Sequence, residues 1–298
     1  DEAYYWRWSK HLAAGYYDHP PLVALVIRIG TALAGDTQLG VRLFSTLLGI
    51  PATWAVWRAA ALLFGDRTLA ATAALYFNLT LIVAVGTVIV TPDAPLLTAS
   101  AFVLFFLAKV HQTGRGAWWL AVGLAVGSAL AAKYTALMFG ASILAWLLLV
   151  PEQRRWLATP WPYLGGVVAF AVFAPVILWN AEHGWASFIK QFGRAVPHGF
   201  TLRFLFEYVG GQVGLATPFV FVLGAMGLAA FARGCGGAPG ARVLLAALIW
   251  PFAVYFAWHS LHARVEGNWT APLFPAFAVA AAAAAHAVDW RGRWAQAA

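Results

Sequence analysis

The residues of this 298-residue chain that could do chemistry lie in short polar clusters between long apolar runs. The first cluster is the adjacent carboxylate pair Asp1 and Glu2, which a run of aromatic residues follows. Partial burial at a membrane boundary raises the pKa of a carboxylate, so that it can act as a general base. The same pair would also suit the start of a helix, where the helix dipole favours negative charge. The residues alone leave both interpretations open.

The second cluster, residues 16–22, contains Asp18 and His19 followed by two prolines. Proline fixes the backbone and lacks an amide donor, so this loop has a defined shape. His19 could bind a phosphate as a cation or hydrogen-bond donor, and Asp18 could hold the imidazole ring or a metal ion. A plain turn at the membrane surface explains the same residues.

Asp93 and Lys133 are isolated charges beside strongly apolar sequence. Asp93 could simply cap the helix that starts near Pro95. Lys133 lies within the apolar stretch 117–150 and marks a turn between two spans. There its amine could reach the membrane interface or bind an anion.

Two further loops place hydrogen-bonding and charged residues beside tryptophans. Anchoring in the interfacial aromatic belt explains the tryptophans. It does not explain the acidic and basic groups among them, which are therefore candidates for binding substrate or phosphate. These candidates are Asn180, Glu182 and His183 in the first loop, and Arg264, Glu266 and Asn268 in the second.

The elements that must position these clusters are membrane helices. Hydrophobic residues make up 62% of the chain and charged residues only 10%, with a mean hydropathy of +0.74. A soluble domain carries about 25% charged residues. We therefore predict a single transmembrane domain over residues 1–298, with a first outer loop at 1–36 and about nine spans over 39–288. The predicted spans are 39–63, 68–87, 92–110, 117–132, 135–150, 161–180, 205–231, 243–260 and 269–288.

This topology places every candidate residue on one membrane face. The opposite face receives ten basic and three acidic residues, all in very short connections, against nine basic and eight acidic on the candidate face. Short basic connections are typical of the cytoplasmic side, so we expect the candidates to face outward. The basic residues are scattered rather than gathered in one patch, which argues against nucleic acid as a partner. The single cysteine excludes an internal disulfide and a thiolate metal cluster.

In these clusters the chain resembles the family 39 glycosyltransferases, in the protein mannosyltransferase-like and Rgt/ArnT-like bacterial branch with the GT-C fold. The similar stretches follow the family's order across nearly the whole chain. They are residues 1–5, 17–22, 91–95, 133–136, 179–185 and 264–269.

The resemblance implies an all-α, polytopic transmembrane helical bundle of the GT-C type, with amphipathic juxtamembrane helices in the first outer loop. It implies an inverting glycosyltransferase that moves a sugar from a polyprenyl-phosphate donor to a hydroxyl of lipid A, another glycan, a lipid or a protein. The enzyme would lie in the bacterial inner (plasma) membrane, with its site facing the periplasm or cell exterior. The family's acidic pair usually follows a first span, so we also expect a helix ahead of Asp1.

The resemblance also assigns roles to the candidate residues. The catalytic set would be Asp1 as base, its neighbour Glu2, and Asp93. His19 stands where aminoarabinose transferases have a phosphate-binding lysine, so donor binding would depend on pH. Lys133 or Arg264 would then supply the permanent positive charge that binds the donor phosphate. The expected substrate-binding residues are Asp18, Tyr134, Asn180, Glu182, His183, Glu266 and Asn268.

No cofactor is required in this scheme, although Asp18, His19 or His183 could bind a divalent metal. The alternative function is a transporter or flippase for a lipid-linked or anionic substrate. Such proteins place ionisable groups near the membrane midplane, often in internal repeats. The sequence contains no such repeat, and its charged groups lie at one face, which favours an enzyme.

Overall fold

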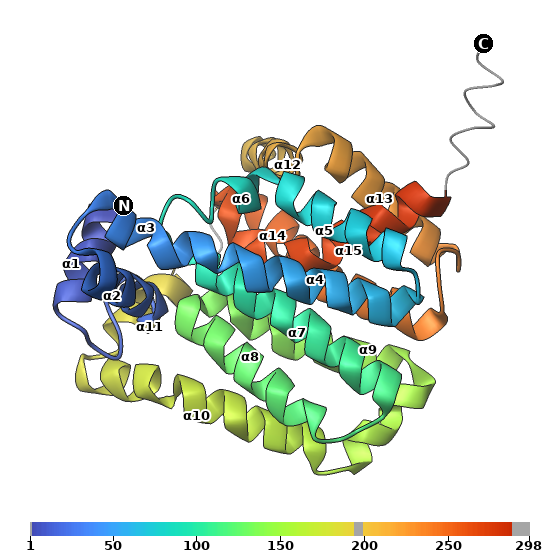
Figure 1. The fold of residues 1–298 in the computed structure, drawn as a ribbon, viewed down its shortest axis with the longest axis horizontal. Helices are drawn as coiled ribbons and strands as arrows, with labels where there is room; N and C mark the ends of the chain where they lie inside the picture. The colour runs from blue at the N-terminus through green and yellow to red at the C-terminus, as the bar shows by residue number, and fades with distance from the viewer. Residues whose placement is uncertain (1, 194–198, 288–298) are drawn as a thin grey trace.

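A computed structural model describes residues 2–193 and 199–287, and helices form all of its regular structure in that part of the chain (Figure 1). The elements in the first half are α1 (Glu2–Lys10), α2 (Leu22–Ala34), α3 (Gln38–Leu47), α4 (Gly49–Phe64), α5 (Arg67–Leu79), α6 (Leu81–Ala84), α7 (Asp93–Thr113), α8 (Trp118–Ala132), η1 (Tyr134–Leu137) and α9 (Met138–Leu149). Those in the second half are η2 (Pro151–Ala158), α10 (Trp161–Glu182), α11 (Ala186–Gly193), α12 (Arg203–Ala216), α13 (Pro218–Ala232), α14 (Pro239–Ser260), η3 (Gly267–Leu273) and α15 (Phe274–Ala287).

Within residues 2–193 and 199–287, five helical segments are long and apolar enough to cross a bilayer. Two strongly bent helix pairs would raise that number to seven if each pair counts as one span. The five segments are Gln38–Phe64, Asp93–Thr113, Trp161–Glu182, Pro239–Ser260 and Gly267–Ala287. The nine crossings predicted from the sequence stay a prediction.

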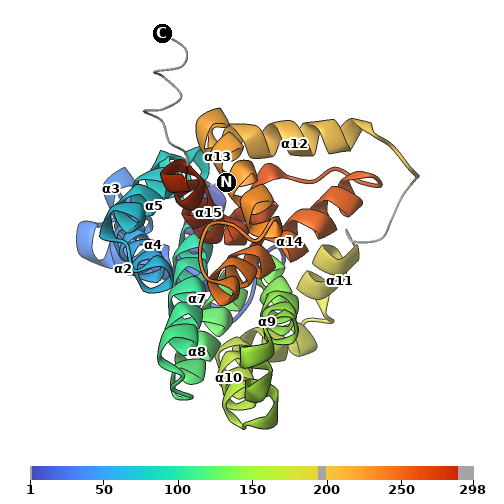
Figure 2. The same cartoon turned by 90° about the vertical axis from the view of Figure 1, so that its right-hand side faces the viewer.

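Two of the predicted spans differ from the structure. Residues 68–87 are not one helix, because Thr80 has an extended backbone that separates α5 from α6. Residues 205–231 form α12 and α13, which are bent by 104°. The bend lies at Thr217, where φ is 63°, and Pro218 begins α13. A residue before proline is sterically disfavoured in the α conformation, so the Thr-Pro pair ends α12. Figure 2 shows α12 crossing one edge of the molecule before the chain turns into α13.

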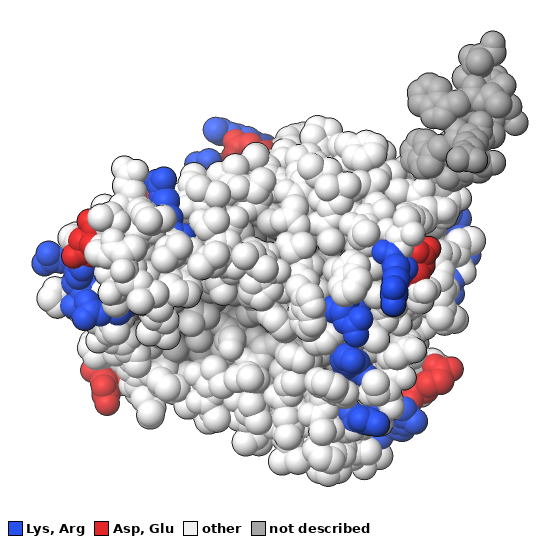
Figure 3. Space-filling model, in the orientation of Figure 1, with Lys and Arg blue, Asp and Glu red and all other residues white. Residues whose placement is uncertain are grey.

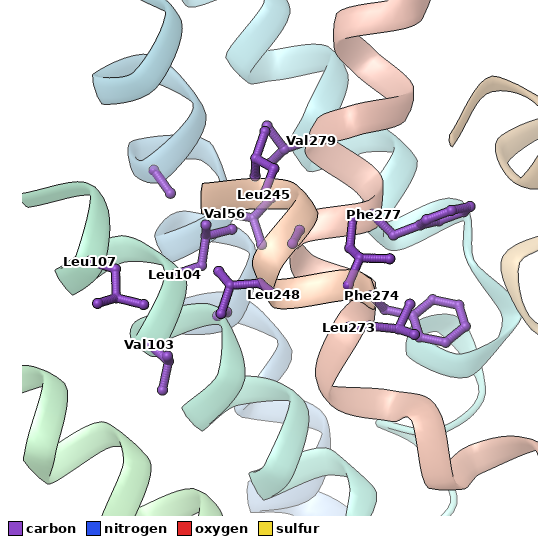
Figure 4. Close-up of a cluster of buried hydrophobic side chains, with 14 of the residues drawn as sticks. Val56, Val103, Leu104, Leu107, Leu245, Leu248, Leu273, Phe274, Phe277 and Val279 are labelled. Atoms are coloured by element: carbon purple, nitrogen blue, oxygen red, sulfur yellow. The ribbon is translucent and has the colours of Figure 1, made fainter. Parts of the chain in front are cut away.

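The core forms around α7, which packs against α4 on one side and α8 on the other. Its buried residues include Val103, Leu104 and Leu107, and helices α14 and α15 add further apolar side chains (Figure 4). The alanine run of α15 allows close approach to α13. A Cβ on Gly227 would collide with the carbonyl group of Ala280.

Helices α8 and α10 meet through small residues in the same way. A Cβ on Gly123 would collide with the carbonyl group of Gly165, and one on Gly127 would lie 2.7 Å from Cβ of Val172. Two apolar helices in lipid gain little from hydrophobic burial against each other, so their association depends on close packing of small residues. This glycine seam fixes the position of α10 along α8.

Helix α7 runs from one end of the bundle to the other, and the two ends differ in their residues. Its first residue, Asp93, lies at the end that carries the first outer loop, which we call the site end. Its last turn lies at the other end, where His111 packs against Gly240 and Phe64 against Gly237. We call this second end, which also includes η2, the basic end. A helix of this length spans about 30 Å, which is the thickness of the bilayer's hydrocarbon core.

Candidate active site

A buried ion pair joins Asp93 and Lys133 at the site end. Lys133 Nζ lies 2.7 Å from Asp93 Oδ1, and the two side chains are only 7% and 5% exposed. The other oxygen, Oδ2, accepts hydrogen bonds from Asn268 Nδ2 at 2.6 Å and from Thr91 Oγ1 at 3.1 Å. Asp93 begins α7, Lys133 is the extended residue between α8 and η1, and Asn268 lies in η3. Three predicted site residues from distant parts of the chain therefore form one network.

This network restricts what its members can do. Both oxygens of Asp93 are occupied, and the amine of Lys133 also lies 3.5 Å from the Asn268 carbonyl oxygen. Charges removed from water need such partners, and loss of one member of a buried pair costs about 3–5 kcal/mol. Lys133 therefore holds Asp93 in place, whether or not it also binds a donor phosphate.

Arg42 binds the second carboxylate, Glu2. Its Nε donates to Glu2 Oε1 at 2.9 Å and its Nη2 to Oε2 at 2.5 Å. The amide of Val90 also donates to Oε1, at 2.9 Å. The hydrogen bonds from Arg42, and more weakly that from Val90, hold the pKa of Glu2 below its usual range despite partial burial. Glu2 is thus an ionised tether between α1, α3 and the loop that leads to Asp93. Asp1, the predicted base, lies outside the described residues.

Asp18 is the centre of a third polar cluster. Its carboxylate accepts a hydrogen bond from the Tyr4 hydroxyl at 2.5 Å and pairs with Lys190 of α11. Gln191 also donates to the Asp18 carbonyl oxygen, at 2.5 Å. Burial raises the pKa of Asp18, but the hydrogen bonds from Lys190 and Tyr4 outweigh it and leave that pKa below the usual range. Burial and the neighbouring Asp18 raise the pKa of Tyr4 to about 12. This cluster joins the first outer loop to α11.

A cavity of about 470 Å³ opens beside the Asp93 network. It brings together five of the predicted site residues, and aromatic side chains such as Tyr255, Phe256 and Trp269 form much of the rest of its wall. An apolar wall that excludes water strengthens the electrostatic interactions inside a site. The five predicted residues are His19, Lys133, Tyr134, Glu266 and Asn268.

The remaining predicted residues do not line this cavity among the described positions. Asn180 is fully buried: its Nδ2 donates to the Val176 carbonyl oxygen at 3.0 Å, and its Oδ1 accepts from the Phe188 amide at 3.3 Å. Asn180 therefore joins α10 to α11. Glu182 and His183 are exposed at the end of α10.

His183 stacks on the Trp179 ring, with the ring centroids 4.1 Å apart. The Arg264 guanidinium is mostly exposed and lies 3.8 Å from carboxylate oxygens of both Glu207 and Glu266. The predicted substrate-binding roles of Asn180, Glu182 and His183 therefore stay predictions. The same holds for the predicted phosphate-binding role of Arg264.

The residues considered for a divalent metal do not form a ligand set in the structure. Asp18 is engaged by Lys190 and Tyr4, and His183 lies against Trp179. In the described parts of the chain, no three histidine, cysteine or acidic side chains are grouped as a metal site would need. We therefore derive no step through a metal ion.

Comparison with known proteins decides the family. The model of the family described as dolichyl-phosphate-mannose-protein mannosyltransferase matches residues 18–179, which is more than half of the chain. This chain belongs to that family. The assignment confirms the resemblance on which the predicted site residues depend.

Two relatives from bacteria extend the comparison. The chain is 29% identical over 281 residues to the lipid A galacturonosyltransferase RgtD of Rhizobium johnstonii, covering 93% of this chain and 58% of that protein. It superimposes on ArnT of Cupriavidus metallidurans, in the apo state and bound to undecaprenyl phosphate, with a TM-score of 0.75 at 19% identity. The match covers 94% of this chain and 52% of ArnT. The shared fold confirms the predicted multi-pass helical GT-C architecture, and the chain spans little more than half the length of these relatives.

Sequence reasoning missed several residues of the site. Arg42 sits within a segment predicted as a plain span, and only its charge in an apolar helix could have marked it. Lys190 and Gln191 lie in α11, in the long loop predicted on the candidate face, but no motif singled them out. Tyr5 and His259 line the cavity from α1 and α14.

Proposed function

We propose that this chain carries the reaction centre of a membrane glycosyltransferase that uses a polyprenyl-phosphate-linked sugar. The observation that carries the proposal is the cavity beside the Asp93–Lys133–Asn268 network. Its lining combines a carboxylate, a buried amine, an amide and imidazole groups within aromatic walls. A sugar phosphodiester needs this mixture of groups, which can bind its phosphate and orient a hydroxyl group.

The proposed reaction is a single inverting displacement. A carboxylate, assigned to Asp1 by family resemblance, takes the proton of the acceptor hydroxyl while its oxygen forms the bond to the anomeric carbon. The bond between that carbon and the phosphate oxygen breaks, and polyprenyl phosphate leaves with one additional negative charge. Donors such as His19 contribute most if they are already directed at that developing charge. The Arg42–Glu2 tether keeps the start of α1 beside the loop that leads to Asp93.

The lipid chain of the donor has a suitable binding region. A second cavity of about 470 Å³ lies between α12, α13, α14 and α15, with an almost entirely apolar lining. Gln212 lines it and bonds to η3, donating to the Gly267 carbonyl oxygen at 3.0 Å and accepting from Thr270 at 2.7 Å. Since η3 also carries Asn268, the two cavities share a wall element. We propose that the sugar phosphate binds in the polar cavity and the polyprenyl chain in the apolar one.

Acceptor and location follow from the relatives as proposals. Lipid A is the favoured acceptor because RgtD is a lipid A galacturonosyltransferase, and another glycan, a lipid or a protein remain the alternatives to test. We place the site on the outer face of the bacterial inner membrane. The buried pair, Asp93 and Lys133, lies where helices begin and end rather than at mid-helix, which favours a transferase over a transporter.

The test uses the complete protein in lipid nanodiscs with a panel of polyprenyl-phosphate sugars, beginning with the galacturonosyl donor, and lipid A as acceptor. Mass spectrometry would follow both the consumption of donor and the mass gain of acceptor. We expect turnover that Asp1→Asn lowers by about 10²–10⁴-fold, the usual contribution of a general base. Arg233→Gln, at an exposed position of the basic end, is the control and should keep wild-type turnover. Consumption of no donor in the panel would overturn the proposal, and full activity of Asp1→Asn would overturn the assigned base.

A further inference from the structure

The basic end of the bundle carries cations without carboxylate partners. Eight basic and two acidic residues of the described chain lie there. None of these eight forms an ion pair with an acidic side chain in residues 2–193 and 199–287. One of the two acids, Asp66, is used to cap α5 through the amides of Thr68 and Leu69. The eight basic residues are Arg58, Arg67, Lys109, Arg115, Arg154, Arg155, Arg233 and Arg242.

The short helix η2 holds two of these basic residues on an anchored backbone. It is bent by 116° from the preceding helix α9, so it runs across the end of the bundle instead of continuing along it. Two buried side chains, Gln153 and Trp156, hold it in place. Gln153 Nε2 lies 3.1 Å from His111 Nδ1, and its Oε1 accepts from Trp156 Nε1 at 3.0 Å. Arg154 and Arg155 are exposed on this anchored helix.

Arg155 of η2 lies against the turn between α7 and α8, whereas Arg154 Nε donates to the Leu148 carbonyl oxygen at 2.8 Å, at the end of α9. A Cβ on Gly114 would come within 3.1 Å of the Arg155 guanidinium, and Arg115 is the next residue of that turn. Lys109 Nζ, one turn earlier on α7, lies 5.4 Å from the Trp118 ring centroid. Figure 3 shows Lys and Arg side chains gathered at this end, beside a wide flank of the molecule on which no charged side chain is visible.

We propose that Lys109, Arg115, Arg154 and Arg155 form a binding site for the phosphate headgroup of an anionic phospholipid. Guanidinium groups bind phosphate through paired hydrogen bonds. Trp118, which is partly exposed, lies beside Lys109, and tryptophan favours the depth at which headgroup and acyl chain meet. The site belongs to the leaflet opposite the candidate active site, so its ligand is a lipid of the bilayer and not the sugar donor.

The general preference for basic residues on one membrane side explains why cations occur at this end. That preference needs only exposed charge on flexible connections. It does not need a helix turned across the bundle and anchored by a buried glutamine and tryptophan. The anchoring of η2 is therefore the observation that distinguishes a binding site from a charged rim.

The experiment measures lipid retention by native mass spectrometry of the complete protein. The protein is released from nanodiscs of phosphatidylcholine, alone or mixed with phosphatidylglycerol. The test variant is Arg154→Gln with Arg155→Gln. The matched control is Arg7→Gln with Arg28→Gln, which removes the same charge from two exposed positions in the first outer loop.

We expect the wild type and the control to retain phosphatidylglycerol in preference to phosphatidylcholine. The test variant should lose affinity by about five-fold for each cation removed, with an unchanged melting temperature. Equal losses in test and control variants would show unspecific charge attraction and overturn the site, as would no loss in either. Displacement of phosphatidylglycerol by inorganic phosphate would also overturn it, by indicating a soluble ligand. Because sugar transfer is not measured, this result is independent of the proposed enzymatic activity.

Discussion

The two ends of the bundle use charge in different ways. At the site end, six carboxylates of the described chain lie within ion-pair distance of a basic side chain, and the Asp93–Lys133 pair is almost fully buried. At the basic end, Arg154 and Arg155 are exposed and form no ion pair with the carboxylates of residues 2–193 and 199–287. A buried pair is stable only in one geometry, whereas an exposed cation is satisfied by water or headgroups. The site end therefore determines positions, and the basic end mainly provides charge.

The sharpest test of this contrast is Lys133→Met. It leaves Asp93 buried without its cation, and we expect a loss of about 3–5 kcal/mol in stability. Thermal unfolding in detergent would measure it. The double variant Asp93→Asn with Lys133→Met removes both charges and should recover most of the loss, without recovering transfer. Equal destabilisation of the single and double variants would show that the pair is not the cause.

His19→Lys tests the phosphate-binding side of the cavity. An imidazole is mainly cationic only below about pH 6.5, whereas lysine keeps its charge to about pH 10. We expect the wild-type KM for the donor to rise as the pH increases from 6 to 8. The KM of the variant should change little over this range. At pH 8 we therefore expect the KM of the wild type to exceed that of the variant by about ten-fold, if the imidazolium charge is fully lost. Kinetics at both pH values would check this, and parallel pH profiles would exclude His19 as the phosphate ligand.

Arg42→Gln should have a smaller effect, because this pair with Glu2 is partly exposed. We expect a loss of about 1 kcal/mol at pH 7. The hydrogen bond from Arg42 is the main reason that the pKa of Glu2 is lowered in the fold. A carboxylate with a lowered pKa stabilises the fold above its unfolded pKa, and this contribution is lost as the pH falls through the folded value. The difference between wild type and variant should therefore shrink below pH 4.5, the ordinary value for glutamate. Melting curves from pH 7 to acid would show whether it does.

The smallest effect is expected at the basic end. Arg154→Gln with Arg155→Gln should change the stability of the protein in phosphatidylcholine by less than about 0.5 kcal/mol, since exposed substitutions rarely do more. The same unfolding assay measures this change. A loss comparable to that of Lys133→Met would mean that the basic end is also determined by paired charge, and the contrast would fail.

The sequence predicted that Asp93, Lys133 and Asn268 lie at one level of the bundle, but it did not predict the bonds among them. Asp93, Lys133 and Asn268 each lie where an apolar run begins or ends, and helices of similar length place such positions together. The partners of Glu2 and Asp18 could not be predicted in this way. Arg42 lies within an apolar helix, and Lys190 lies in a short helix whose packing depends on tertiary contacts.

The bend within the predicted span 205–231 has a local cause that could be read from the sequence. Thr217 precedes Pro218, and a residue before proline resists the helical conformation. A hydropathy average over residues 205–231 does not register this pair, so it predicts one continuous helix where the structure has two. The structural role of Asn180 was less accessible, because a polar residue at a helix end looks the same whether it faces a ligand or ties two helices together.

The close packing of α8 and α10 through glycines has a consequence for the part of the cavity wall that α11 forms. Since α10 is held along its length by backbone contact, the direction of α11 is decided only after α10 ends, over residues 183–185. Gly184 and Trp185 both have positive φ there, at 63° and 59°. Such angles suit glycine and strain tryptophan. A substitution in this turn that changes its backbone angles would change the direction of α11. It would thereby move Gln191 and Phe192, which line the polar cavity, without replacing any lining residue.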